Sequence, residues 1–163
     1  MSLDDDAPNR RGDAARVLDI DLEELIWVLN SRDPLGESSH WLNIESGEIL
    51  FVAGPDAADE ADVDPRDDDR WLGIEPIESS EAFRVMEDFA DQCGDAWLAR
   101  ALGQALRERK PFRRFKDVLA AHTAQREAWF AFERQAMEVI ARKWCEDHDI
   151  APRWIPRPAR PTP

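Results

Sequence analysis

The chain has 163 residues and a formal net charge of -14, from 35 acidic and 21 basic residues. This length predicts a single domain, and the excess of acid argues against general coating of nucleic acid, because a negative protein repels polyanions. Seven Trp and seven Phe occur without any Tyr, which excludes phenol chemistry and places most aromatic rings in the expected core.

The two cysteines and the N-terminus indicate a compartment. Cys93 and Cys145 are far apart and lack CxxC or Cys/His spacing, which predicts neither a zinc site nor a disulfide framework. The N-terminus is polar and acidic, and no stretch approaches the roughly 18 apolar residues that span a bilayer. We therefore expect a protein of the cytoplasm, without a membrane segment.

The first residues with a regular pattern form an expected helix. Residues 1–15 are rich in Asp, Asn, Arg and Gly, and we expect them to be a disordered leader. From Asp21 to Ser31 apolar residues recur at helical spacing. Asp19 or Asp21 can cap the start of this helix, and Asp33-Pro34 ends it.

After this helix the spacing of the apolar residues becomes typical of β-strands. Residues 40–44 and 48–52 flank Glu45-Ser46-Gly47, where Gly47 supplies the positive φ of a tight hairpin turn. An acidic loop over 55–69 follows, and residues 71–74 predict a third strand. The loop lacks the ordered carboxylate spacing of an EF-hand, so we expect no metal site there.

The sequence from Ser79 to residue 150 predicts a series of helices. Ser79 or Ser80 caps a helix that stops at Gly94, Asp95 starts the next, and Pro111 suits the first turn of a third. Thr123 can cap the last and longest helix, whose expected apolar stripe is Trp129, Phe132, Ala136, Ile140 and Trp144. Residues 151–163, which are rich in Pro and Arg, predict an extended tail.

These elements predict an α+β protein. A small three-stranded antiparallel sheet, at about residues 40–75, is preceded by one helix and packed against a C-terminal segment of about four helices. Residues 16–150 form a single domain between the leader and the tail.

Several segments resemble those of a family of small bacterial proteins that is catalogued as uncharacterised. The resemblance covers roughly residues 20 to 150. Its segments are Trp41-Leu42-Asn43-Ile44-Glu45-Ser46-Gly47-Glu48, Ile74-Glu75-Pro76 with residues 81–89, Phe112-Arg113-Arg114-Phe115-Lys116-Asp117, and residues 129–132. Where that family commonly has Tyr, this chain has Phe130. The resemblance supports the α+β class and implies no established activity.

The main candidate site is a basic block from Arg107 to Lys116, in which six cations stand against Glu108 alone. On a helix that begins near Pro111, Phe112 and Phe115 are expected to be buried and the cations exposed. Cations at a helix N-terminus oppose the helix dipole, so an anion is expected nearby. The candidate anion-binding or partner-binding residues are Arg109, Lys110, Arg113, Arg114 and Lys116.

Two interpretations of this block stay open. Either it holds an external phosphate, nucleic acid or acidic protein, or the chain's own carboxylates neutralise it. Glu87, Asp88 and the acidic loop are the internal candidates, and Asp117 can pair with Arg113 at i,i+4.

We expect a non-enzymatic interaction or regulatory module that binds an anionic protein or other partner through this block, without a cofactor. The first alternative is a nucleic-acid-binding protein that uses the same block and the Arg-rich tail. The second is a hydrolase, for which Glu45 and Glu48 or the three histidines would have to converge. The sequence leaves the oligomeric state open.

Overall fold

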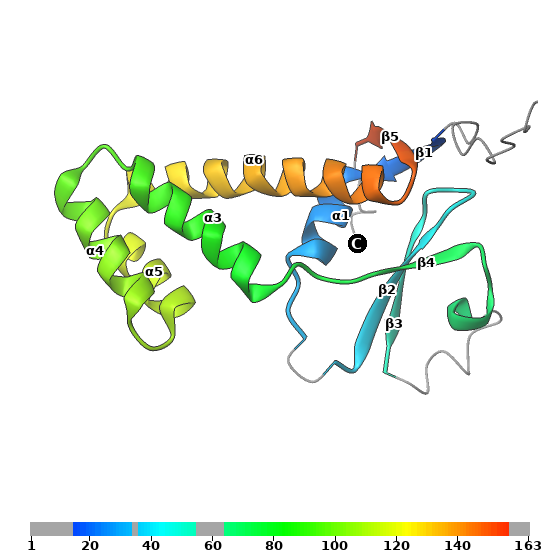
Figure 1. Cartoon of the computed structure of the whole chain (residues 1–163), viewed down its shortest axis with the longest axis horizontal. Coiled ribbons are helices and arrows are strands. Elements are labelled where there is room, and N and C mark those ends of the chain that lie inside the picture. The colour runs from blue at the N-terminus through cyan, green and yellow to red at the C-terminus, as the bar shows by residue number, and fades with distance from the viewer. Residues whose placement is uncertain (1–14, 34–35, 55–63, 157–163) are drawn as a thin grey trace, which may run out of the picture.

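The computed structural model of the protein describes residues 15–33, 36–54 and 64–156. In chain order the elements are β1 (Arg16–Asp21), α1 (Leu22–Leu29), β2 (Ser38–Asn43), β3 (Ile49–Ala53), η1 (Pro65–Asp67), β4 (Trp71–Ile74), α3 (Ser79–Gln92), α4 (Ala96–Arg107), α5 (Pro111–Ala120), α6 (Thr123–Asp147) and β5 (Ile150–Ile155). The helix α6 runs along the molecule, with α3, α4 and α5 beside its first half and both sheets near its second half (Figure 1). This arrangement confirms the predicted α+β class.

The three predicted strands form one antiparallel sheet in the order β3-β2-β4. In the hairpin turn, the side-chain oxygen of Asn43 accepts hydrogen bonds from the backbone N–H groups of Glu45 and Ser46. Gly47 has φ +81°, as its position predicts. A Cβ at Gly47 would also overlap the backbone carbonyl of Asp19, so the turn packs directly against β1.

A second, two-stranded sheet was not predicted. β1 and β5 pair in parallel along their whole lengths, from Arg16 opposite Ile150 to Asp21 opposite Ile155. Residues 151–155 therefore belong to a strand, and the expected tail begins later than predicted. Pro152 fits because β5 has a single strand neighbour among the described residues. The first 14 residues of the expected leader, the remainder of the tail from residue 157, and residues 55–63 of the acidic loop lie outside the described residues.

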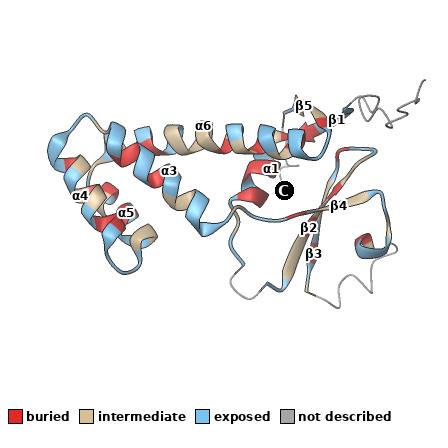
Figure 2. Ribbon diagram, in the orientation of Figure 1, coloured by how far each residue is buried: buried red, intermediate tan, exposed pale blue. Residues whose placement is uncertain are grey.

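The buried side chains form two separate clusters, which lie in the two groups of elements in Figure 2. The sheet core joins both sheets, α1 and the second half of α6, and includes Leu18, Ile20, Leu25, Leu42, Ile74, Met137, Ala141 and Cys145. The helical core joins α3, α4, α5 and the first half of α6, and includes Met86, Phe89, Leu98, Leu102, Phe115 and Trp129. Among the described elements, only α6 contributes buried residues to both cores.

The buried row of α6 differs from the predicted stripe. Its fully buried residues are Trp129, Met137, Ala141 and Cys145, which follow the i,i+4 spacing of a helix face. The other predicted residues are only half-buried, and they flank this row: Phe132, Ala136, Ile140 and Trp144.

Two of the predicted helix caps are confirmed and two are wrong. Asp21 caps α1 by accepting from the N–H of Glu24 at 3.1 Å, and Asp95 caps α4 by accepting from the N–H of Leu98 at 3.1 Å. The helix α3 begins one residue earlier than a Ser79 cap would require, with Glu78 at the N-cap. The hydroxyl of Ser79 instead accepts a hydrogen bond from Arg32. The helix α6 begins at Thr123 itself, with His122 in place of Thr123 at its N-cap.

Candidate functional site

The predicted basic block lies at the turn between α4 and α5. The helix α4 ends at Arg107 and α5 begins at Pro111, so three residues connect the two helices. Lys110 occupies the N-cap position in the left-handed conformation, with φ 54°, and Pro111 follows in the first helical turn. Figure 1 shows this turn at the ends of α4 and α5 that point away from α6. The backbone of α5 therefore begins among the cations of the block.

One cation of the block is neutralised by the chain itself. Arg114 forms an ion pair with Glu108, with 2.9 Å between Nη1 and Oε2, and its Nε donates to the backbone carbonyl of Arg109 at 2.9 Å. The carboxylate that pairs with Arg114 is thus Glu108, within the block, and neither Glu87 nor Asp88 forms an ion pair with a described residue. These two contacts tie α5 to the end of α4 and fix the shape of the turn.

Three other cations have no such partner. Arg109, Lys110 and Arg113 are exposed and form no ion pair with a described residue, and Arg113 is not paired with Asp117. We call these three residues the cationic turn. They lie in the chain on either side of the start of α5, whose first N–H groups themselves favour an anion.

Lys116, the last predicted site residue, lies outside the cationic turn. It lies one helical turn after Phe112 and lines a cavity together with Arg32, which follows α1. The structure thus divides the five predicted site residues among three places: Arg114 is paired with Glu108, Arg109, Lys110 and Arg113 form the cationic turn, and Lys116 lines a cavity. Sequence reasoning missed Arg32 because it comes from a segment some 80 residues earlier in the chain.

A groove between α1 and the β2–β3 hairpin was also missed. It has a volume of about 1070 Å³, and the exposed rings of Trp27 and Phe51 line it on either side of His40. The His40 ring centroid lies 5.6 Å from that of Trp27 and 5.0 Å from that of Phe51. The sequence did hold a signal for this side chain, because strand alternation puts His40 on the same face as Leu42.

The residues proposed for a hydrolase do not come together in the described part of the chain. His40 lies in β2, whereas His122 and His148 flank opposite ends of α6, about 37 Å apart for 25 residues at 1.5 Å each. Glu45 and Glu48 lie at the hairpin turn. Within the described ranges no group of three or more His, Cys, Asp or Glu is placed to hold a metal ion.

The described end of the acidic loop is internally paired. Asp64 forms an ion pair with Arg66 at 2.7 Å, and Asp68 forms one with Arg70 at 2.6 Å. Hydrogen bonds from the Arg70 side chain and backbone lower the pKa of Asp68 to about 2. These two carboxylates are therefore held by neighbouring guanidinium groups.

Fold and site together define an α+β protein with two cores on one long helix and a cationic turn at the end of its helical part. The chain belongs to the uncharacterised protein family UPF0158, whose sequence profile matches residues 16–155. The match begins with β1 and ends with β5, so it extends beyond the roughly 20–150 expected from the sequence segments. This confirms the resemblance to an uncharacterised bacterial family.

A curated relative is the UPF0158 protein PA5073 of Pseudomonas aeruginosa, which is 28% identical over 139 residues. The aligned region covers 84% of this chain and 88% of that protein. No solved structure matches the chain. Among the described residues, no helix is both long enough and apolar enough to cross a bilayer.

Proposed function

We propose that this protein is a non-enzymatic interaction module whose cationic turn binds an anionic partner. The observation that carries the proposal is the set of three exposed cations, Arg109, Lys110 and Arg113, which lack an ion pair with any described residue. They occur in a chain with a formal net charge of -14. Because so many carboxylates are available and do not pair with them, an external anion is the partner that this geometry favours.

The turn suits a carboxylate or phosphate group. Two guanidinium groups offer paired N–H donors that match such an anion, and the N-terminus of α5 adds backbone donors. The ion pair between Arg114 and Glu108 links the start of α5 to the end of α4 beside these cations. Arg114 therefore positions the surface, while the cationic turn contacts the partner.

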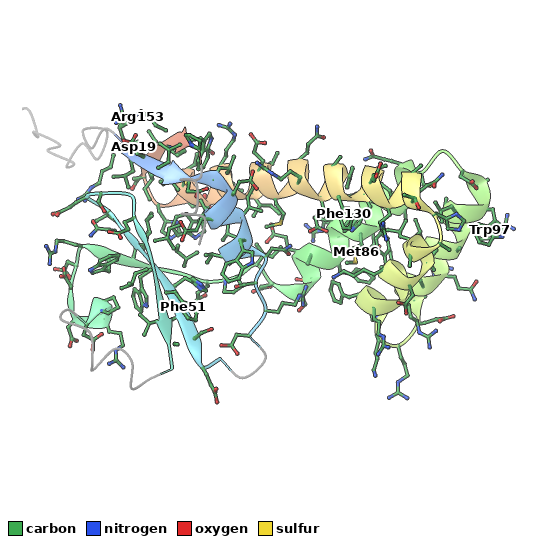
Figure 3. All side chains as sticks on the ribbon, turned by 180° about the vertical axis from the view of Figure 1, so that it is seen from behind. Asp19, Phe51, Met86, Trp97, Phe130 and Arg153 are labelled. Atoms are coloured by element: carbon green, nitrogen blue, oxygen red, sulfur yellow. The ribbon has the colours of Figure 1, made fainter. Side chains whose placement is uncertain are left out.

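The nucleic-acid alternative would use the same surface and the C-terminal arginines. Arg153, one of those arginines, forms an ion pair with Asp19 at 2.7 Å, and the two side chains lie together in Figure 3. Asp19 thus reduces the positive potential that Arg153 offers to a polyanion. The geometry favours an acidic protein partner over a nucleic acid.

The test is affinity capture from native bacterial lysate with three forms of the full chain. The first is wild type, the second carries R109Q, K110Q and R113Q, and the third carries R84Q, R100Q and R126Q. The third is a charge-matched control, because Arg84, Arg100 and Arg126 are also exposed and without an ion pair to a described residue. All three should unfold within about 1 kcal/mol of each other, since exposed substitutions have small effects.

We expect a protein that co-purifies with wild type and with the control but not with the turn variant. Retention of the same partners by the turn variant would contradict the proposal. Loss of the captured material after nuclease treatment, with binding that falls steeply with salt, would support the nucleic-acid alternative instead.

We also propose that the protein acts in the cytoplasm. Both cysteines are free thiols, and Cys145 is fully buried in the sheet core, where burial raises its pKa to about 11. A reducing compartment matches this chemistry.

A further inference from the structure

A small cavity lies where the helical core meets the end of α1. Its volume is about 330 Å³, comparable to roughly ten water molecules at their share of liquid volume. Side chains of α3, α5 and α6 form its apolar wall, among them Met86, Phe112, Trp129 and Met137. Met86 lies on α3 close to α6 (Figure 3). The two methionines make this wall adaptable, because an unbranched thioether side chain fits itself to aliphatic groups.

Two cations line the same cavity. Arg32 is held with its Cζ 4.3 Å from the centre of the Phe112 ring, and its Nη1 donates to the hydroxyl of Ser79 at 3.1 Å. Lys116 lines the cavity from α5. Neither cation forms an ion pair with a carboxylate of a described residue. Both charges are therefore available to an anion in the cavity.

The carboxylate that lines the cavity is already engaged. Glu133 accepts a hydrogen bond from the side-chain amide of Asn30 at 3.1 Å. That bond links α6 to the end of α1, beside the cavity. The cavity thus has two cations without an ion pair against one carboxylate that is held by an amide.

The Trp129 ring forms part of the apolar wall of the cavity. Trp129 is only 2% exposed, and its indole N–H has no hydrogen-bond partner among the described residues. The Phe89 and Phe115 rings hold the indole in place, with centroids 5.4 Å and 4.9 Å away. The indole N–H itself is buried away from the cavity, so Trp129 contributes an apolar ring face to the wall and no donor to a ligand.

We propose that this cavity binds a small amphipathic carboxylate with an aliphatic body. The aliphatic part lies against Met86, Met137 and the Trp129 ring, and the carboxylate lies between Arg32 and Lys116. The two cations select a negatively charged ligand, and the apolar wall selects against a small hydrophilic anion. This site is separate from the cationic turn, and the proposal does not depend on the partner proposed there.

Methionine methyl groups give a direct readout. The chain has three methionines, Met1, Met86 and Met137, so labelling with ¹³C at the methyl carbon yields three signals. Titration of the full-length protein with octanoate should shift the Met86 and Met137 signals in a saturable manner and leave Met1 unchanged. Octanol, which has the same body without the charge, should bind at least tenfold more weakly. Acetate, which has the charge without the body, should cause no saturable shift.

Matched variants on α5 separate this site from the cationic turn. K116Q should weaken octanoate binding at least fivefold, because it removes one of the two cations. R113Q, three residues earlier and exposed, should leave octanoate binding unchanged. Loss of octanoate binding with R32Q and its partial recovery with R32K would show that charge is needed at that position.

The proposal is overturned by any of three results: no saturable shift of Met86 and Met137 at millimolar octanoate, equal affinity for octanol, or equal affinity of K116Q and wild type. None of these results depends on lysate capture by the R109Q, K110Q, R113Q variant, so the two proposals fail independently.

Discussion

His40 lies on the inward face of β2 and lines the groove between α1 and the β2–β3 hairpin. It is 8% exposed, and its Nε2 has no hydrogen-bond partner among the described residues. Burial lowers the pKa of His40 below its ordinary value of 6.5, because the imidazolium is less well solvated there than in water. The folded protein therefore holds this ring in its neutral form near pH 7.

Acidification should consequently destabilise the fold through His40. The unfolded chain binds a proton at this residue near pH 6.5, whereas the folded chain binds it only at lower pH. Stability is full above pH 6.5 and is lost as the pH falls toward the lower pKa of the folded state. Urea unfolding between pH 8 and pH 5 should show a steeper loss for wild type than for the His40→Gln variant.

The exposed His148 provides the control for this measurement. The His148→Gln variant loses the contact of that ring with the Trp144 carbonyl but keeps His40, so its curve should run parallel to that of wild type. If wild type and His40→Gln lose stability in parallel over the whole range, the burial of a neutral His40 is contradicted.

Gly47 shows how far single residues could be understood from sequence. Its positive φ follows from its place in a short hairpin turn, and the structure confirms it. The close approach of Gly47 to the Asp19 backbone involves a segment distant in the sequence, so no local sequence pattern could predict this contact. The same limit applies to the candidate sites: Lys116 was recognised as a cation, but its neighbour Arg32 comes from another element.

Some elements could be predicted from the sequence more readily than others. The helices and the hairpin have strong periodic patterns, and their positions were predicted within a few residues. β1 and β5 are short, and each has a single strand partner among the described residues. Pro152 and the neighbouring arginines predicted an extended tail. In the fold this segment is β5, which pairs in parallel with β1; the paired residues, such as Arg16 and Ile150, are 134 positions apart in the sequence.

The β1–β5 sheet should contribute to stability through its buried face. Ile20 is 0% exposed and packs in the sheet core, so Ile20→Ala should cost about 2–5 kcal/mol of unfolding free energy. Val17, in the same strand, is 58% exposed, and Val17→Ala should cost less than about 1 kcal/mol. Urea unfolding measures both. Equal costs for the two variants would mean that β1 does not pack into the core as described.

At the scale of the whole molecule, two cores share one helix. The apolar stripes of α3, α4, α5 and α6 were visible in sequence, but a stripe does not say which partner covers it. The first half of α6 turned out to face the helical core and the second half the sheet core. Side-chain contacts from α6 to α1, Arg134 with Glu23 and Glu133 with Asn30, tie the middle of α6 to the sheet part.

This division predicts that the two parts open separately. Leu102 in the helical core and Leu25 in the sheet core are both 0% exposed, and replacement of either by Ala should cost about 2–5 kcal/mol. Native-state hydrogen exchange should respond locally: Leu102→Ala should speed exchange in α4 and α5 while β1 and β5 stay protected, and Leu25→Ala should do the reverse.

Each variant serves as the control for the other, because the substitution and its cost are matched and only the core differs. The amides of α6 provide the decisive comparison. Leu102→Ala should affect its first half, around Trp129, more than its second half, around Ala141, because the second half remains packed in the sheet core. Uniform acceleration along the whole chain in both variants would show that the cores unfold as one cooperative unit, with α6 transmitting the loss of packing from one end of the molecule to the other.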